Sequence, residues 1–237
     1  MLGLPIAMHI PDGFLSGGIA AVLWVLAIVA IAIGLRVANR DLDEARVPLL
    51  GVLAAFIFAV QMLNFPVAGG TSGHLLGATL AAVLLGPWIA CLVMAVVLVT
   101  QAFGFADGGV SALGANIVNM GVLGALLAGY VVTAGEKVLP KTRGAFLGLV
   151  GAVSWLAVMV GATATGFELA LSDTVPLGTV LPPMLGVHAL IGIGEAVITV
   201  AAVSAVMVAR PDLVTLGRSY ELAPPAPAAP ASARGAS

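Results

Sequence analysis

The chain has 237 residues, of which 61% are hydrophobic and only 8% are charged. Soluble domains carry roughly 25% charged residues, so this composition excludes a soluble domain and indicates an integral membrane protein. The net charge of −2 says little about partners, and we expect no nucleic acid among them. The single cysteine, Cys91, excludes a disulfide within the chain and any multi-cysteine metal site.

Long apolar runs predict a compact all-α bundle of about seven transmembrane helices. A membrane-spanning helix needs about 20 mostly apolar residues, and the abundant small residues, including 30 glycines, favour close helix packing. The predicted spans are 15–37, 47–66, 73–86, 87–104, 113–134, 143–170 and 182–209. The third and fourth spans are short and meet at Gly86–Pro87, which indicates either a tight turn or a kink in one long helix.

The positive residues predict the orientation of the bundle. All nine fall in three groups: Arg36, Arg40 and Arg46; Lys137, Lys141 and Arg143; and Arg210, Arg218 and Arg234. Positive charge marks cytoplasmic loops, and the three groups share one side only if the chain crosses seven times. We therefore expect the N-terminus outside and the C-terminus in the cytoplasm.

The two ends of the chain differ from its apolar body. Residues 1–7, "MLGLPIA", lack the basic and long apolar regions of a signal peptide. Residues 8–210 are expected to form the membrane domain, and the Pro/Ala-rich residues 211–237 a disordered cytoplasmic tail.

The three histidines are all expected at the outer end. His9 precedes the first span, His74 begins the third, and His188 lies about 33 Å above Arg210 at ~1.5 Å per helical residue. Any one of them suits a helix cap or a loop hydrogen bond. Together, with few competing charges, they predict a transition-metal site, because imidazole binds such metals and polar groups in membranes tend to be functional.

The stretch "MHIPDGFLS" suggests how His9 binds a metal. Pro11 stiffens the segment and favours an extended Ile10. In a chain that begins at Met8, the free amine, the His9 amide and the His9 ring are able to chelate one cation. With His74 this makes four nitrogens, and square-planar nitrogen ligation favours Ni(II) or Cu(II).

Four segments in order resemble the CbiM/NikM family, the substrate-binding components of cobalt and nickel energy-coupling-factor transporters. They are "MHIPDGFLS" (8–16), "GGTSGHLLGATLAAVLLGPW" (69–88), "LGANIVNMG" (113–121) and "HALIGIGEAVIT" (188–199). The resemblance implies a seven-helix bundle in a bacterial or archaeal cytoplasmic membrane, with Met8, His9 and His74 as ligands of Co(II) or Ni(II). It also implies a transmembrane coupling subunit, two cytoplasmic ATPases and a possible small accessory membrane subunit.

Residues 1–7 depart from this family pattern, because they turn the Met8 nitrogen into a peptide amide. We expect translation to start at Met8. The absence of the P-loop pattern GxxxxGK[ST] in the sequence agrees with ATP hydrolysis by partner subunits, so the chain is expected to be neither an enzyme nor a holder of a cofactor.

Five further polar residues are candidates for support of the ligands: His188, Glu195, Asn116, Asn119 and Gln101. Ligand histidines commonly bond their second ring nitrogen to such a partner. Hydrogen bonds between helices are the alternative for His188, Glu195 and the two asparagines, and Gln101 is expected to close the pocket.

Two other functions remain open. One is a proton-coupled secondary metal transporter with Glu195 as the proton relay, although no repeat between the halves is found. The other is an intramembrane metalloenzyme, for which the sequence lacks HExxH.

A stripe of small residues on the first span suggests a partner surface. Gly17, Ala20, Ala27 and Gly34 lie near one helix face. We expect part of this span, with the cytoplasmic loop that carries the arginines, to contact the coupling subunit, with packing inside the bundle as the alternative.

Overall fold

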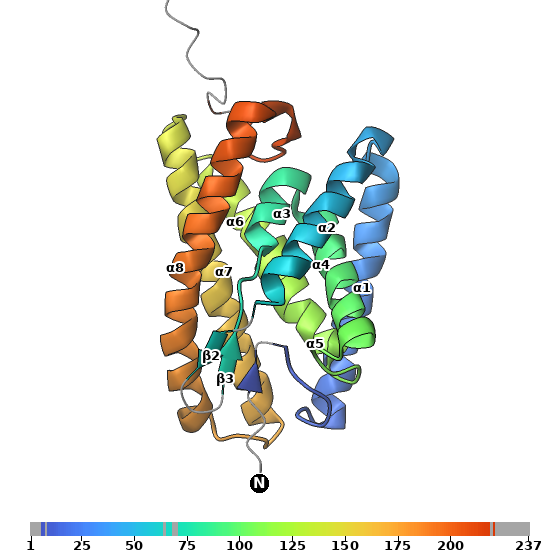
Figure 1. Cartoon of the computed structure of the whole chain (residues 1–237). Helices are drawn as coiled ribbons and strands as arrows, with labels where there is room; N and C mark the ends of the chain where they lie inside the picture. Colours follow the sequence, from blue (N-terminus) through green and yellow to red (C-terminus); the bar gives the residue numbers. More distant parts are fainter. Residues whose placement is uncertain (1–5, 8, 64, 68–70, 219, 221–237) are drawn as a thin grey trace, which may run out of the picture.

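The computed structural model describes residues 6–7, 9–63, 65–67, 71–218 and 220. Six helices in these ranges are long and apolar enough to cross a membrane, which confirms a multi-pass, all-α membrane fold (Figure 1). They are α1 (Gly17–Asp41), α2 (Val47–Gln61) with its short 3₁₀ lead η1 (Glu44–Arg46), α4 (Pro87–Phe105), the continuous α5 (Leu113–Ile117), η2 (Val118–Leu127) and α6 (Ala128–Gly135), α7 (Arg143–Leu171) and α8 (Leu177–Ala209).

The third predicted span, 73–86, is only partly helical. Helix α3 (Ala78–Leu85) has eight residues and is about 12 Å long, too short to cross a membrane alone. Gly77 ends the preceding segment with φ of 71°, a left-handed conformation that favours glycine and cannot continue a helix. The prediction of a helix through 73–77 is therefore wrong; the chain there is not helical and completes the crossing with α3.

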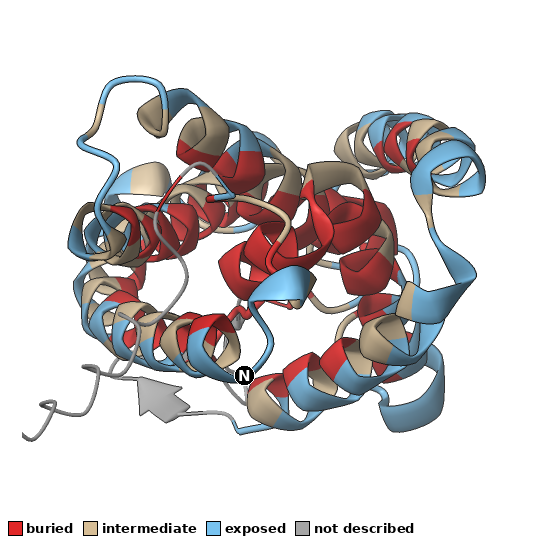
Figure 2. Ribbon diagram, turned by 90° about the horizontal axis from the view of Figure 1, so that it is seen from above, coloured by how far each residue is buried: buried red, intermediate tan, exposed pale blue. Residues whose placement is uncertain are grey.

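The alternative of one long helix over the third and fourth spans is excluded. Gly86, with φ of 84°, separates α3 from α4, and the two helices pack against each other. All eight residues of α3 are buried. Viewed along the bundle, the surrounding helices turn buried residues inward and exposed residues outward (Figure 2).

A small sheet replaces the predicted helical end of the second span. Helix α2 stops at Gln61, and β2 (Phe65–Val67) pairs antiparallel with β3 (Thr71–Gly73), with Phe65 opposite Gly73. The strand β1 (Ile6–Ala7) pairs parallel with the other edge of β3. The expected helix at residues 65–66 is therefore wrong, since Pro66 follows the end of α2 and cannot donate a helical hydrogen bond.

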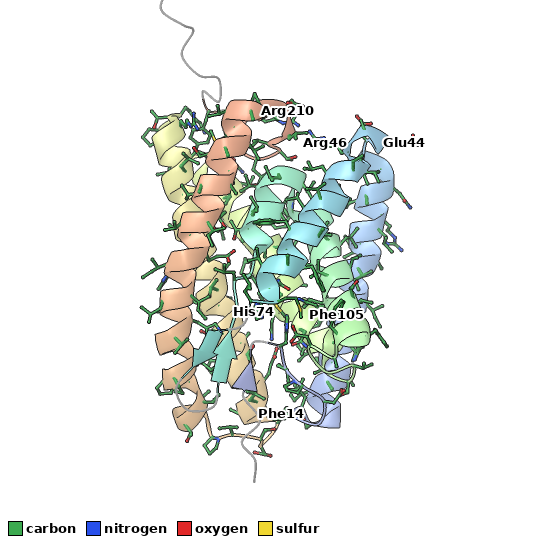
Figure 3. All side chains as sticks on the ribbon, viewed as in Figure 1. Phe14, Glu44, Arg46, His74, Phe105 and Arg210 are labelled. Carbon is green, nitrogen blue, oxygen red and sulfur yellow. The ribbon has the colours of Figure 1, made fainter. Side chains whose placement is uncertain are left out.

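The two ends of the bundle differ in charge as predicted. Arg46 and Arg210 lie at one end, with Phe14 near the other (Figure 3). The strands β2 and β3 lie at the same end as Phe14 (Figure 3). By the positive-inside rule the arginine end faces the cytoplasm.

The small-residue stripe of α1 lies partly inside the bundle. Ala27 and Gly34 are buried, and a Cβ on Gly34 would meet the Leu92 side chain of α4 at 2.9 Å. At these two positions the alternative, packing inside the bundle, holds, and the contact of part of this span with a partner stays a prediction.

The described part of the predicted tail packs against the bundle. Residues 211–218, called here the C-terminal strap, include the 3₁₀ turn η3 (Pro211–Leu213). Thr215 donates its backbone N–H to the Val83 carbonyl at 3.0 Å and its hydroxyl to the Leu84 carbonyl at 2.7 Å. Arg46 donates to the Thr215 hydroxyl at 2.9 Å. The strap thus satisfies carbonyls that α3 leaves free at its cytoplasmic end.

Candidate metal site

The segment after His9 is attached to the α5 helix by a side-chain amide. Asn116 accepts a hydrogen bond from the Ile10 N–H at 2.9 Å and donates one to the Ile10 carbonyl at 3.2 Å. The Gly109 N–H also donates to that carbonyl, at 2.9 Å. This pairing fixes the backbone directly beside His9, which is itself 2% exposed.

Asp12 adds a second attachment of the same segment. Its carboxylate accepts hydrogen bonds from the Ser111 hydroxyl at 2.5 Å and the Ser111 N–H at 2.7 Å. These two bonds lower the pKa of Asp12 below its ordinary value. The ionised form that makes them therefore persists at neutral pH.

The structure brings His9 and His74 together. Their ring centroids lie 4.3 Å apart, with the planes inclined by 37°. His74 is fully buried, and its Nδ1 lies 2.8 Å from the Leu75 carbonyl. A carbonyl only accepts, so Nδ1 carries the proton and Nε2 keeps its lone pair. That Nε2 is buried and has no hydrogen-bond partner, which is the state required of a metal ligand.

His188 lies on α8 next to the same segment. Its Nδ1 lies 2.7 Å from the Met184 carbonyl, one helical turn earlier. Its Nε2 is buried without a hydrogen-bond partner and would lie 3.3 Å from a Cβ added to Gly73. The ring therefore lies against the backbone that leads into His74.

Asp107 faces His9 from the loop after α4. One carboxylate oxygen, Oδ1, lies 3.1 Å from His9 Nδ1, although the angles there are not those of a hydrogen bond. Burial raises the pKa of Asp107, but the nearby His9 and His74 together outweigh burial, and the net pKa is lower than usual. A carboxylate charge therefore lies beside the two histidines.

A buried clamp holds the segment that carries His74. The Glu195 carboxylate accepts the Leu76 and Gly77 N–H groups, each at 2.7 Å. Gln61 donates to the Leu76 carbonyl at 2.8 Å and accepts a hydrogen bond from Gln101 at 3.1 Å. Glu195 on α8 and Gln61 on α2 thus fix the two peptide groups on either side of Leu76, next to the candidate ligand, and Gln101 on α4 holds Gln61.

Asn119 belongs to a separate polar cluster between η2 and α7. Its amide nitrogen donates to Glu168 at 2.8 Å and to Thr165 at 3.2 Å. Both Asn119 and Glu168 are buried. Asn119 therefore makes the helix-to-helix contact that the sequence left open, whereas Asn116 contacts the N-terminal segment.

The sequence analysis did not identify Asp107 as a member of the site region, and it did not identify Gln61 there or Glu168 in the separate polar cluster. Ionisable and amide side chains inside membrane helices are expensive and tend to be functional, so a search for them would have found the last two. The predicted ligand Met8 lies outside the described residues. Within the described part of the chain, no three His, Cys, Asp or Glu side chains form a group that could hold a metal ion by themselves.

Fold and site together define a multi-pass membrane protein in which two buried imidazole rings are in contact and carry ring nitrogens without a hydrogen-bond partner. Residues 9–213 match the family model CbiM, described as a cobalt uptake substrate-specific transmembrane region. The chain therefore belongs to the CbiM family of cobalt and nickel transport components, and the resemblance seen in the sequence is confirmed.

Named relatives agree with this membership. The cobalt transport protein CbiM of Sorangium cellulosum is 33% identical over 92% of this chain and 99% of its own length. The fused nickel transport protein NikMN of Rhodobacter capsulatus is 35% identical over 94% of this chain, but over only 66% of its own length. A crystal structure of a truncated transition metal transporter superposes with a TM-score of 0.73 at 32% identity, covering 84% of this chain and 98% of the other.

Proposed function

We propose that the chain captures Co(II) or Ni(II) at the outer face of the membrane as the substrate-specific component of an energy-coupling-factor transporter. The observation that carries this proposal is the contact of two buried imidazole rings, 4.3 Å apart, each with an Nε2 that has no hydrogen-bond partner. Buried polar atoms without partners are rare and call for an explanation such as an ion. Imidazole nitrogen suits both metals.

The proposed ligands are the nitrogen atoms of Met8, His9 and His74. Asn116, Gln61, Gln101 and Glu195 support them by fixing backbone on either side of the histidines, and His188 lies against the same segment. Both Glu195 oxygens accept backbone N–H groups. This engagement favours an anchoring role over the proton relay of a secondary transporter.

The amine of Met8 becomes a ligand only in a chain that starts there. We propose that this shorter form is the tighter binder, because the peptide nitrogen of a longer chain is a poorer ligand at that position. The amine must lose its proton to bind. Metal affinity should therefore fall as the pH drops below the pKa of the amine, about 7.7–8.0. Titration of both forms with Ni(II) across this pH range, together with intact-mass analysis of native protein, tests the proposal. Equal affinities would contradict it.

ATP-driven delivery requires partners, which we propose to be a transmembrane coupling subunit, two cytoplasmic ATPases and a small accessory membrane subunit. Uptake of radioactive nickel into proteoliposomes distinguishes this proposal from secondary transport. We expect uptake only when the partners and ATP are present. Uptake by the isolated chain, driven by a proton gradient, would overturn the proposal and favour the secondary transporter.

A further inference from the structure

A cavity of about 480 Å³ lies at the cytoplasmic end of the bundle, between the connection from α1 to α2, the turn from α3 to α4 and the C-terminal strap. Its apolar wall includes Val37, Leu85 and Ile89, and two arginines, Arg46 and Arg218, line it as well. Arg46 is partly buried and Arg218 is exposed. Arg46 lies at the arginine end of the bundle, away from the candidate metal site (Figure 3), so this cavity is a separate feature of the molecule.

Both arginines of the cavity keep N–H groups for a ligand, because a guanidinium carries five N–H donors. Arg46 uses Nη1 for the Thr215 hydroxyl at 2.9 Å and Nη2 for the Asp212 carbonyl at 3.2 Å. Arg218 uses Nε for the Val214 carbonyl at 3.3 Å. Within the part of the chain that the structure describes, neither arginine forms an ion pair with a carboxylate.

Two carboxylates also line the cavity, and both are engaged elsewhere. Asp41 pairs with Arg40 at 2.7 Å, and Asp43 accepts the Ala45 N–H at 3.0 Å. Because the first of these carboxylates is neutralised by its own arginine, the two arginines of the cavity face only the charge of Asp43. The cavity therefore carries a net positive charge and favours an anionic ligand.

The cavity lies at the end of a gap between two membrane helices. Helix α1 packs on α4 and α5, and α2 packs on α4 and α3, but α1 and α2 hardly contact each other. The two helices diverge from the connection that joins them (Figure 1). On other sides α4 is covered by α3, α5 and η2. Val96 and Phe103 of α4, which are 59% and 68% exposed, therefore face the membrane through the gap between α1 and α2.

We propose that an anionic phospholipid of the cytoplasmic leaflet binds here, with its phosphate at Arg46 and Arg218 and its acyl chains in the gap between α1 and α2. Arginine binds phosphate oxygens with paired N–H groups. The cytoplasmic leaflet carries anionic lipids, and basic pockets between membrane helices on that side bind lipid headgroups. The exposed apolar side chains of α4 match acyl chains, whereas a soluble phosphate compound would leave them uncovered.

The test uses the full chain, purified in a neutral detergent and titrated with phosphatidylglycerol, with zwitterionic phosphatidylcholine, and with glycerol phosphate, which has no acyl chains. Binding is followed by native mass spectrometry and by the melting temperature. Arg218→Gln and Arg46→Gln each remove one positive charge from the cavity. Arg210→Gln is the matched control, because Arg210 lies at the same end of the bundle (Figure 3) but pairs with Asp212 at 2.8 Å and is not part of the cavity wall.

The native chain and Arg210→Gln should bind phosphatidylglycerol more tightly than phosphatidylcholine, and each cavity variant should lose about 5-fold in affinity for phosphatidylglycerol. Arg218→Gln is the decisive variant, because Arg46 also holds the strap. Equal affinity for phosphatidylglycerol in Arg218→Gln and Arg210→Gln would overturn the proposal. Binding of glycerol phosphate as tight as that of the lipid would overturn it in favour of a soluble anion. A native chain that binds no phosphatidylglycerol, together with an Arg218→Gln variant that no longer co-purifies with the coupling subunit, would overturn it in favour of a protein partner.

Discussion

At the scale of residues, the site depends on histidine rings in which one nitrogen contacts a backbone carbonyl and the other has no hydrogen-bond partner. His74 and His188 each hold a carbonyl through Nδ1 and leave a buried Nε2 without a partner. The contact of His9 with His74 agrees with the sequence, because both were expected at the outer end. The partners of these residues were not predictable from the sequence. Ile10 and Asn116 are 106 positions apart, and only packing brings them together.

Replacing Asn116 tests the attachment of the N-terminal segment. Asn116→Ala removes two hydrogen bonds to Ile10, each worth about 0.5–1.5 kcal/mol in net terms. We expect metal affinity to fall about 10–100-fold, as for other residues that hold ligands. Hydrogen exchange at residues 9–12 should quicken as well. Asn119→Ala breaks contacts between helices instead and should leave exchange at these residues unchanged; equal effects of the two changes would contradict the assignment.

At the scale of elements, the largest difference from the sequence prediction is α3. Its apolar run is typical of a short transmembrane helix, but the first five residues of that span are not helical. The reason is distant in sequence, since Glu195 is 119 residues from Leu76 and takes the N–H groups ahead of α3. Apolar periodicity predicts where a helix is possible, but it carries no information about a carboxylate from another helix.

The clamp on Leu76 can be tested at Glu195. In Glu195→Gln one of the two backbone N–H groups faces an amide NH₂ instead of an oxygen, and a buried unpaired group costs about 1–3 kcal/mol. We expect about 10–100-fold weaker metal binding from a His74 that is less well held. Glu168→Gln is the control, because Asn119 can still donate to its carbonyl oxygen. Unchanged metal affinity in Glu195→Gln would show that the clamp serves stability alone.

Larger side chains at the buried positions of the α1 stripe should lower the stability of the bundle. Ala27 is 0% exposed, so Ala27→Leu should destabilise the bundle by about 1–3 kcal/mol through overpacking. Ala20, which is only partly buried, should tolerate leucine better. Thermal unfolding of both variants in detergent measures the difference, and equal melting temperatures would argue against the packing of α1 on α4.

At the scale of the whole molecule, the sequence predicted the architecture well. Hydropathy predicted six of the spans close to their observed bounds. The three groups of positive residues required seven crossings, and α3 with the segment before it completes the seventh. What hydropathy could not predict is the strap, because the apolar residues Leu213, Val214 and Leu216 are too few to form a span. The strap is ordered by hydrogen bonds to Val83 and Leu84.

The orientation can be read from cysteine labelling. The native Cys91 is buried, so a cysteine introduced on the surface dominates labelling. Asp173→Cys, in the loop between α7 and α8, should react with a membrane-impermeant thiol reagent in intact cells. Lys137→Cys, between α6 and α7, should react only after the membrane is opened. The reverse pattern would invert the assigned orientation.

The most direct test of metal capture is a titration of purified protein with Ni(II) and Co(II), using the native chain, His9→Ala, His74→Ala and His188→Ala. We predict that the native chain binds tightly, that the first two variants lose tight binding while remaining folded, and that His188→Ala weakens binding by about 10–100-fold. Unchanged affinity in both His9→Ala and His74→Ala would contradict the metal site described above.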